Sequence, residues 1–423
     1  MRTRRETPAR SPRVGLFGLL GSGNLGNDGS MQAVLDYLKA AQPHATVSCL
    51  CKGYQTVREY HGLATTPLNW YDSTGVRVRR LPVVLVKVLG KVFDAVRTLV
   101  FVAGQDVVIV PGMGILEATL PLRPWQDPYA LFLLCLAGRL TRTPVALVSV
   151  GASAPSNPVT RALIVGAARL AGYRSFRDEL SRDAMRGMGV DTSADEVYPD
   201  LAFALPIPPE YLSDDPVIGL GVMAYYGGDE DRARSEQIHH GYVTKMQEFV
   251  RWLLDNGRHV RLFTGDRVDE LVVAEILADV RAQRPEVSSH VITEPVRTLP
   301  DLMTQMSTVD IVVATRYHNV VSALRLAKPT IAVGYSAKNE AIMQDMGQAG
   351  FCQQVGTLDV ALLQEQLLEL ERDTERVRAT LRARNLANRD RLDHQFAVLT
   401  ERLFPGERSS PRRASRGHLR VTD

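Results

Sequence analysis

Short apolar runs alternate with amphipathic stretches along most of the chain. A second series of runs begins after 205–216, which is rich in proline and aspartate as linkers often are. Such alternation is typical of parallel sheets with helical crossovers. We therefore predict an α/β protein with two open, Rossmann-like domains. The runs expected to form strands are 13–19, 46–51, 106–112, 144–151, 217–226, 259–265, 290–294, 310–315 and 330–335.

The same pattern predicts how the chain is divided. One helical pattern laced with Arg and Glu runs through 359–403, and we expect its end to cross back to the first domain. Both chain ends are rich in Arg, Ser and Pro, a composition typical of disordered tails. The predicted units are a basic tail (1–12), a first domain (13–210), a second domain (211–380), a helix bracing the first domain (381–405) and a second basic tail (406–423).

Composition and charge fit a globular enzyme. The chain has 423 residues, of which 45% are apolar and 23% charged. The net charge is +3, but residues 1–13 contribute +4 and residues 406–423 contribute +3, which leaves the body at −4. A body with that charge does not resemble a nucleic-acid platform, so we expect no nucleic-acid partner.

The N-terminal sequence imitates an export signal, with Arg4 and Arg5 before the run VGLFGLL. That run is short, holds two glycines and leads into a Gly/Asn loop, so a first strand explains it better. The cysteines form no C-x-x-C pair and have no His at metal-ligand spacing, which predicts reduced thiols, no metal site and a cytoplasmic location. They are Cys49, Cys51, Cys135 and Cys352.

The stretch 77–104 allows two interpretations. Lys87, Lys91, Asp94 and Arg97 recur about one helical turn apart in an otherwise apolar helix. A basic amphipathic helix can lie on an anionic membrane surface. The alternative is a core helix with a polar stripe, which we favour at this point.

The loop GLLGSGNLGNDGS (18–30) contains glycines at G-x-G-x-x-G spacing. A dinucleotide site also needs an acidic residue at the end of the second strand, where this sequence has Lys52, and no G-K-[ST] follows to make a P-loop. What remains is a loop whose backbone N–H groups reach an anion at the start of a helix expected near Asp28. The alternative is a tight turn capped by Asn or Asp. Loops of small residues also follow other predicted strands, at Gly112, Gly114 and Gly151.

Basic residues follow strands of both predicted domains. The run 310–315 delivers Arg316 and His318 to its carboxyl end, and in extended backbone these two side chains point the same way. Lys338 opens the helix after the next strand, and Arg177 ends a short strand of the first domain. Ligands of open α/β sheets bind at the carboxyl ends of the strands. These positions predict a receptor for a small anion, with His318 able to move protons.

Four stretches resemble the polysaccharide pyruvyl transferase family from about residue 13 to 350. They are GSGNLGNDGSMQAVLDYL, VPGMGILEA, SFRDELSRDAMRGMGV…YPDLAFALP and TRYHNVVSALRLAKPTIAVGYSAKNEAIMQDMG. The resemblance implies a two-domain GT-B-like fold with a central cleft. It also implies transfer of a pyruvyl group from phosphoenolpyruvate onto two hydroxyls of a sugar, with a cyclic ketal and phosphate as products.

The resemblance assigns roles to the residues above. Arg177, Arg316 and Lys338 would hold phosphoenolpyruvate, and His318 would be the catalytic acid/base, with no metal or further cofactor. Family members often read G-N-x-G-D in the first loop, where this chain has Asn27 followed by Asp28. The residues expected to bind the acceptor sugar or shape its loops are Gly23, Asn24, Gly26, Asn27, Asp28, Gly112 and Gly114.

Two alternatives stay open at this point. The first is a GT-B glycosyltransferase that uses a nucleotide sugar. Such a site usually has a carboxylate for the ribose, and Glu294 could serve as that carboxylate. The second is a non-catalytic module that contacts membrane through residues 77–104 and the basic tails. Contact with the inner membrane surface is also compatible with the transferase, if its acceptor is a glycolipid. The sequence does not name the acceptor sugar or the oligomeric state.

Overall fold

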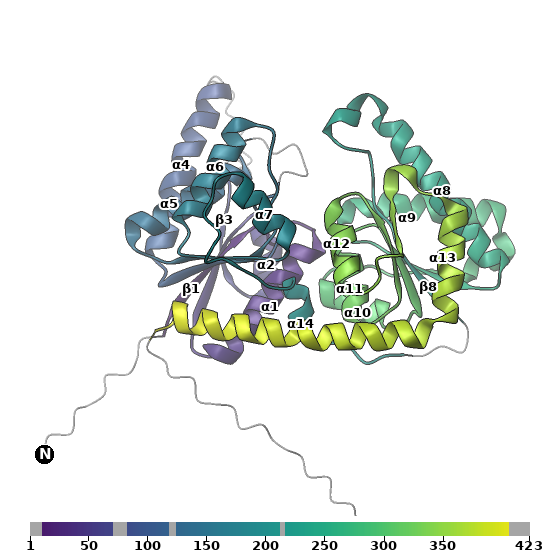
Figure 1. The fold of residues 1–423 in the computed structure, drawn as a ribbon. Coiled ribbons are helices and arrows are strands. Elements are labelled where there is room, and N and C mark those ends of the chain that lie inside the picture. The colour runs from purple at the N-terminus through teal and green to yellow at the C-terminus, as the bar shows by residue number, and fades with distance from the viewer. Residues whose placement is uncertain (1–10, 71–82, 118–123, 212–215, 406–423) are drawn as a thin grey trace, which may run out of the picture.

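The computed structural model describes residues 11–70, 83–117, 124–211 and 216–405. Two parallel sheets lie side by side, each covered by helices on both faces (Figure 1). The first has the strand order β3-β2-β1-β4-β5-β6-β7 and the second β10-β9-β8-β11-β12-β13. The predicted fold class is confirmed. Our expected domain boundary at residue 210 lies between β7 and β8, and most of both predicted tails falls outside the described residues.

The elements have the following bounds. The strands are β1 (Arg13–Gly18), β2 (Thr46–Cys51), β3 (Ala64–Pro67), β4 (Val107–Pro111), β5 (Val145–Val150), β6 (Tyr173–Phe176), β7 (Glu196–Val197), β8 (Val217–Gly221), β9 (His259–Phe263), β10 (Val291–Thr293), β11 (Ile311–Ala314), β12 (Thr330–Gly334) and β13 (Cys352–Gln354). The helices are α1 (Leu25–Ala41), α2 (Tyr54–His61), α4 (Val83–Ala103), α5 (Asp127–Thr141), α6 (Pro158–Leu170), α7 (Glu179–Gly187), α8 (Ser235–Asp255), α9 (Glu270–Gln283), α10 (Leu299–Met306), α11 (Tyr317–Arg325), α12 (Ala337–Asp345), α13 (Val360–Arg372) and α14 (Thr374–Leu403).

Every predicted strand is present. The central strands are buried throughout, as in β5, because parallel sheets are covered on both faces and their strands read as continuous apolar runs. β6 is the short strand predicted to end at Arg177. The strands that nothing in the pattern predicts are β3, β7 and β13, which lie at sheet edges and are short. Their sequences, ATTP, EV and CQQ, contain no apolar run.

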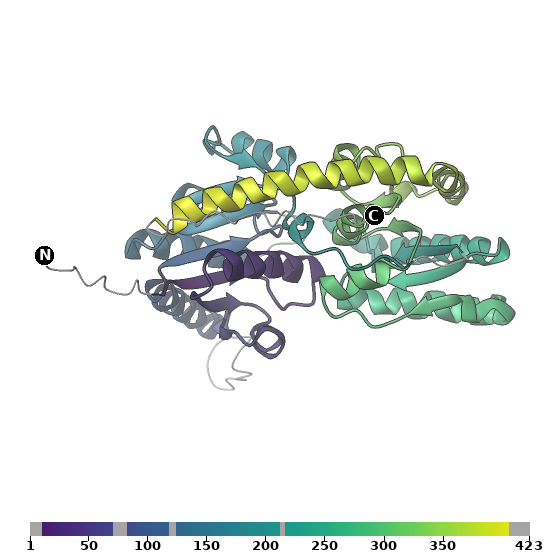
Figure 2. The same ribbon diagram turned by 90° about the horizontal axis from the view of Figure 1, so that it is seen from below.

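The C-terminal helix spans both halves of the molecule (Figure 2). The expected single helix over 359–403 is wrong: α13 ends at Arg372 and α14 begins at Thr374. Asn385 Nδ2 of α14 donates to the backbone oxygen of Leu324 in the second domain at 2.8 Å. Further along, Thr400 pairs with Tyr37 of the first domain at 3.0 Å. The helix thus fastens one domain to the other.

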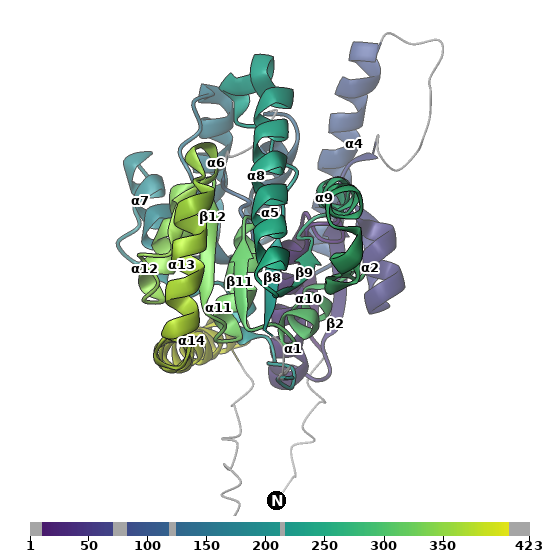
Figure 3. The same ribbon diagram turned by 90° about the vertical axis from the view of Figure 1, so that its right-hand side faces the viewer.

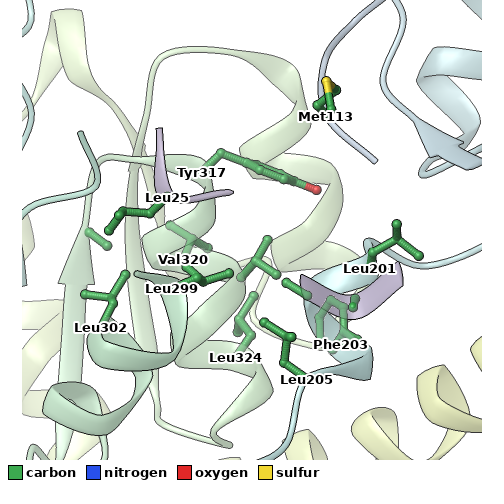
Figure 4. Close-up of a cluster of buried hydrophobic side chains, with 14 of the residues drawn as sticks. Leu25, Met113, Leu201, Phe203, Leu205, Leu299, Leu302, Tyr317, Val320 and Leu324 are labelled. Carbon is green, nitrogen blue, oxygen red and sulfur yellow. The ribbon is translucent and has the colours of Figure 1, made fainter. Parts of the chain in front are cut away.

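An apolar seam joins the two domains beneath the site. Side chains of α1 and of the short 3₁₀ helix η1 (Leu201–Ala204) meet those of α10 and α11 (Figure 4). Leu25 and Phe203 come from the first half, and Leu299 and Leu324 from the second; all four are buried. The seam fixes the first domain against the second.

The orientation of α4 is the reverse of the favoured interpretation. Its polar stripe faces inward: Asp94 accepts hydrogen bonds from Arg97 at 2.7 Å, from Lys91 at 3.2 Å and from the backbone N–H of Trp70 at 2.7 Å. Much of its apolar surface is exposed. The favoured interpretation of α4 as a core helix with a polar stripe is therefore wrong, because the polar stripe is the buried side and the apolar side is exposed. The side chain of Lys87 lies outside the described residues.

Candidate functional site

The opening loop is held together by its own polar side chains. Helix α1 begins at Leu25, one turn before the expected start near Asp28. Asn24 is its N-cap and accepts from the N–H groups of Gly26 at 3.2 Å and Asn27 at 3.3 Å. Asp28 accepts from the N–H of Gly21 at 2.6 Å, and burial raises its pKa to about 6. Asn24 and Asp28 therefore brace the loop, whereas Asn27 is half-buried.

The glycines of this loop serve its conformation and its approach to the second domain. Gly23 has a φ of +96°, which few other residues adopt. Leu25 N–H donates to the backbone oxygen of Gly265 at 3.3 Å. A Cβ at Gly26 would overlap the His318 ring, and one at Gly29 would overlap Leu299. The G-x-G-x-x-G spacing here brings the start of α1 against the second domain.

The other small-residue loops surround a carboxylate. Gly112 has a φ of +49° and lies against Ser30 of α1. Gly114 and Gly151 flank Glu117, and a Cβ at either glycine would collide with its carboxylate. The side chain of Glu117 is only 9% exposed. Two of the predicted small-residue loops, those at Gly114 and Gly151, therefore surround a negatively charged side chain, that of Glu117.

Two cations of the predicted receptor hold that anion. Arg177, directly after β6, donates to one oxygen of Glu117, and Lys338 of α12 donates to the other at 3.1 Å. The ring of Tyr317 lies under both, 4.6 Å from the Arg177 guanidinium carbon and 5.2 Å from the Lys338 nitrogen. Asp200, on the loop after β7, lies 3.6 Å from Arg177 Nη1. The site therefore draws on both domains.

Charge decides the state of Glu117. Burial alone would raise its pKa, but the charges of Arg177 and Lys338 outweigh that effect and hold the pKa at about 2. The carboxylate in turn raises the pKa of Arg177 against the effect of burial. Both groups are therefore ionised at neutral pH, in a buried cluster where Arg177 and Lys338 face the carboxylate of Glu117, and Asp178 and Asp200 lie 3.6 Å from Arg177.

His318 lies beside this cluster as a neutral imidazole. Burial lowers its pKa to about 4, and the charges of Arg177 and Lys338 act in the same direction, against the carboxylate of Asp200. Its Nε2 is 3.7 Å from Asp200 Oδ2, an ion-pair distance too long for a hydrogen bond. Within the described chain, His318 Nε2, Asp200 Oδ2 and Arg177 Nε are buried without a hydrogen-bond partner. These three atoms lie close together, so a bound ligand or water could supply their missing hydrogen bonds.

Arg316 belongs to a separate arm of the site. The expectation that it points with His318 is wrong, because α11 begins at Tyr317 and Arg316 is its N-cap. Its Nε and Nη2 donate to Asp269 at 3.0 and 2.6 Å. Asp269 is fully buried and also accepts backbone N–H groups of Ala224 and Gly265 at 2.9 and 3.2 Å. The pair fixes the guanidinium through its Nε and Nη2.

Sequence reasoning missed four residues of this arrangement: Glu117, Asp200, Asp269 and Tyr317. Each lies in a loop or helix start after the carboxyl end of a strand, which is where such folds bind ligands. Their position after strand ends is the feature that could have identified these four residues. The described residues contain no group of His, Cys, Asp or Glu suited to hold a metal ion.

Comparison with known proteins adds a family and a fold. A family model described as polysaccharide pyruvyl transferase matches residues 24–337. No curated protein sequence matches the chain. A candidate UDP-N-acetylglucosamine 2-epimerase from Listeria monocytogenes has a TM-score of 0.63 at 12% identity, over 94% of this chain and 98% of that one.

Two further solved structures are similar. The UDP-GlcNAc 2-epimerase of Methanocaldococcus jannaschii has a TM-score of 0.54 at 11% identity, over 84% of this chain and 91% of its own. The glycosyltransferase SnogD of Streptomyces nogalater has 0.50 at 16% identity, over 93% and 100%. At such identities the likeness concerns the fold alone, which is the GT-B arrangement of two Rossmann-like domains.

Proposed function

Because the chain belongs to the polysaccharide pyruvyl transferase family, we propose that it transfers a pyruvyl group from phosphoenolpyruvate to two hydroxyls of a sugar in a polysaccharide or glycolipid. The observation that carries the proposal is the buried carboxylate of Glu117 between Arg177 and Lys338. A pocket that holds one carboxylate so closely suits another. Phosphoenolpyruvate carries a carboxylate and a phosphate, and the arm formed by Arg316 offers a further N–H group.

Donor binding then takes the form of an anion exchange. The donor carboxylate replaces Glu117 on Arg177 and Lys338, and the phosphate reaches toward Arg316. Once it leaves the two cations, Glu117 loses the charges that keep its pKa near 2, while its burial still favours the protonated form. The same exchange brings negative charge beside His318 and raises the pKa of that imidazole.

In the proposed reaction the imidazolium of His318 gives its proton to the methylene carbon of the donor, and C2 gains positive character. One sugar hydroxyl attacks C2 and returns a proton to the imidazole of His318. The bond between C2 and the phosphate oxygen breaks, and the phosphate leaves with that electron pair, held by the cations. The second hydroxyl then bonds to C2, passes its proton to the phosphate and closes the ketal. Stabilising charge at the departing group is commonly the largest contribution to rate. No further cofactor enters this scheme.

Asp200 is a positioning residue in this scheme. Its Oδ1 accepts the N–H of Ala202 at 3.0 Å, which fixes the carboxylate, and its Oδ2 faces both His318 and Arg177. It keeps the imidazole oriented and supports its protonated form. We place the reaction in the cytoplasm, since the four cysteines are free thiols.

The test is phosphate release from phosphoenolpyruvate with a panel of glycans, with ketal formation followed by mass spectrometry. His318→Asn should abolish turnover and keep donor binding. The matched control is His240→Asn, an exposed histidine on α8, which should change neither. Turnover that survives His318→Asn would overturn the role of His318. A thermal shift with nucleotide sugars and none with phosphoenolpyruvate would favour the glycosyltransferase alternative.

A further inference from the structure

One face of α4 is apolar and exposed. Between residues 88 and 100, the exposed apolar side chains of α4 follow one another at spacings of one, three or four residues and are 39% to 67% exposed. This spacing places them on one face of the helix. We call this the outer face of α4. It consists of Val88, Leu89, Val92, Phe93, Val96, Leu99 and Val100. Figure 3 shows α4 at the margin of the first domain, away from α14.

The fold holds this face outward. Asp94, Lys91 and Arg97 pair with one another on the inner side, and Arg97 also donates to the backbone oxygen of Leu68 at 3.0 Å. Trp70 stacks on Phe93 with ring centroids 5.5 Å apart. A helix anchored by its polar residues cannot turn its apolar residues inward without breaking these contacts. Exposed apolar patches of this kind mark interaction surfaces.

The size of the outer face favours a lipid surface over a second copy of the chain. The face is a single helix stripe of about 18 Å by roughly 10 Å. Stable dimers bury about 800 Å² of accessible surface on each partner, which would have to include surface beyond this stripe. A lipid surface has no such requirement, because a helix lying in the interface gains from every apolar side chain that enters the bilayer.

Charge and aromatic residues favour a lipid surface. The sequence that leads into the outer face, from 77 to 87, holds four basic residues and no acidic one, and basic residues close in sequence to an apolar helix face favour anionic lipid. Trp125 is 58% exposed and packs edge-on against Tyr129, whose ring lies 5.7 Å from the Lys91 nitrogen. Tryptophan prefers the level of the lipid headgroups.

We propose that the outer face of α4 docks the protein on an anionic lipid bilayer. The helix lies on the surface; none of the described helices is long and apolar enough to cross a membrane.

The test is flotation with vesicles of equal phosphatidylglycerol and phosphatidylcholine, compared with phosphatidylcholine alone. The full-length protein should float with the anionic vesicles at least tenfold better than with the neutral ones. The triple variant Val92→Ser, Phe93→Ser, Val96→Ser should lose at least tenfold of that binding. The control triple is Leu271→Ser, Leu362→Ser, Leu386→Ser, at positions exposed to a similar degree in the second domain and α14, and should bind normally.

Equal flotation of the two triple variants would overturn the proposal, and so would a full-length protein that does not float. A protein that is dimeric by light scattering and becomes monomeric in the first triple variant would show that a second copy covers the face. Circular dichroism melts establish that both variants fold. Flotation needs neither donor nor acceptor, so its result is independent of the proposed transferase activity.

Discussion

The Lys338 ammonium of the second domain donates to the Glu117 carboxylate of the first at 3.1 Å. Arg177 holds the other oxygen of the same carboxylate. One buried side chain thus links the two domains. Under the proposed function it occupies the position of the donor carboxylate, so the contact stabilises the empty protein and has to be given up when the donor binds.

Glu117→Gln should therefore bind phosphoenolpyruvate more tightly. The amide is the same size but carries no charge, so the donor no longer competes with a resident anion for Arg177 and Lys338. We expect a gain of about tenfold, or about 1.4 kcal/mol, by isothermal titration calorimetry. Glu179→Gln, which removes an exposed carboxylate of α7, is the control and should bind as wild type. Weaker donor binding by Glu117→Gln would contradict the exchange.

Two Gly→Ala substitutions in helices should have opposite effects. At Gly26 a Cβ overlaps the His318 ring, so α1 or the imidazole has to move. We expect Gly26→Ala to cost about 1–3 kcal/mol of stability and about 100-fold in turnover. At Gly241 of α8 nothing lies within 4 Å, and Gly241→Ala should stabilise by up to about 1 kcal/mol. Urea unfolding and kcat measure both. A harmless Gly26→Ala would refute the close packing.

Acid should destabilise the protein through His318. Burial lowers its pKa from 6.5 to about 4, so the unfolded chain takes up a proton that the native state refuses. The free energy of unfolding is therefore highest above about pH 6.5, as far as His318 is concerned, and it decreases as the pH falls toward 4. The loss reaches about 3 kcal/mol. Urea unfolding at pH 7, 5.5 and 4.5 measures it.

The matched variants for this pH dependence are His318→Gln and His240→Gln. The first should flatten the fall in stability between pH 6.5 and 4, and the second should leave it unchanged. Glu117 acts in a lower window, since its pKa falls from 4.5 to about 2. Its contribution is present above about pH 4.5 and is lost as the pH drops toward 2. An unchanged profile in His318→Gln would contradict the assignment.

Arg316→Lys should weaken donor binding. Asp269 takes two N–H groups of the guanidinium, and only a planar fork can hold that carboxylate and still offer a donor to a ligand. We expect about a tenfold rise in the Kd for phosphoenolpyruvate. Arg251→Lys disrupts a comparable pair with Asp279 between α8 and α9 and should leave the Kd unchanged. Equal effects of the two substitutions would remove Arg316 from the donor arm.

Much of the fold follows from the sequence, because buried parallel strands read as apolar runs. The positions of Arg177, Arg316 and Lys338 after strand ends also follow from it. Their partners do not, since Glu117 and Asp269 are far away in sequence from the cations they hold, and only tertiary packing pairs them. The direction of His318 depends on where α11 begins, and a shift of one residue at a helix start turns a side chain to another face. For α4, periodicity shows a polar and an apolar side but not which one faces the core.

The buried amide of Gln395 has a consequence for how the protein is made. Its Nε2 donates to Ser149 Oγ at 3.0 Å and Ser175 Oγ at 2.9 Å, inside the sheet of the first domain. During synthesis Ser149 and Ser175 emerge from the ribosome more than two hundred residues before Gln395. Until α14 arrives, the Ser149 hydroxyl lacks the partner that Gln395 provides, whereas Ser175 Oγ still accepts the N–H of Ser149 at 2.9 Å. The domain that is translated first is thus completed by a helix that is translated almost last.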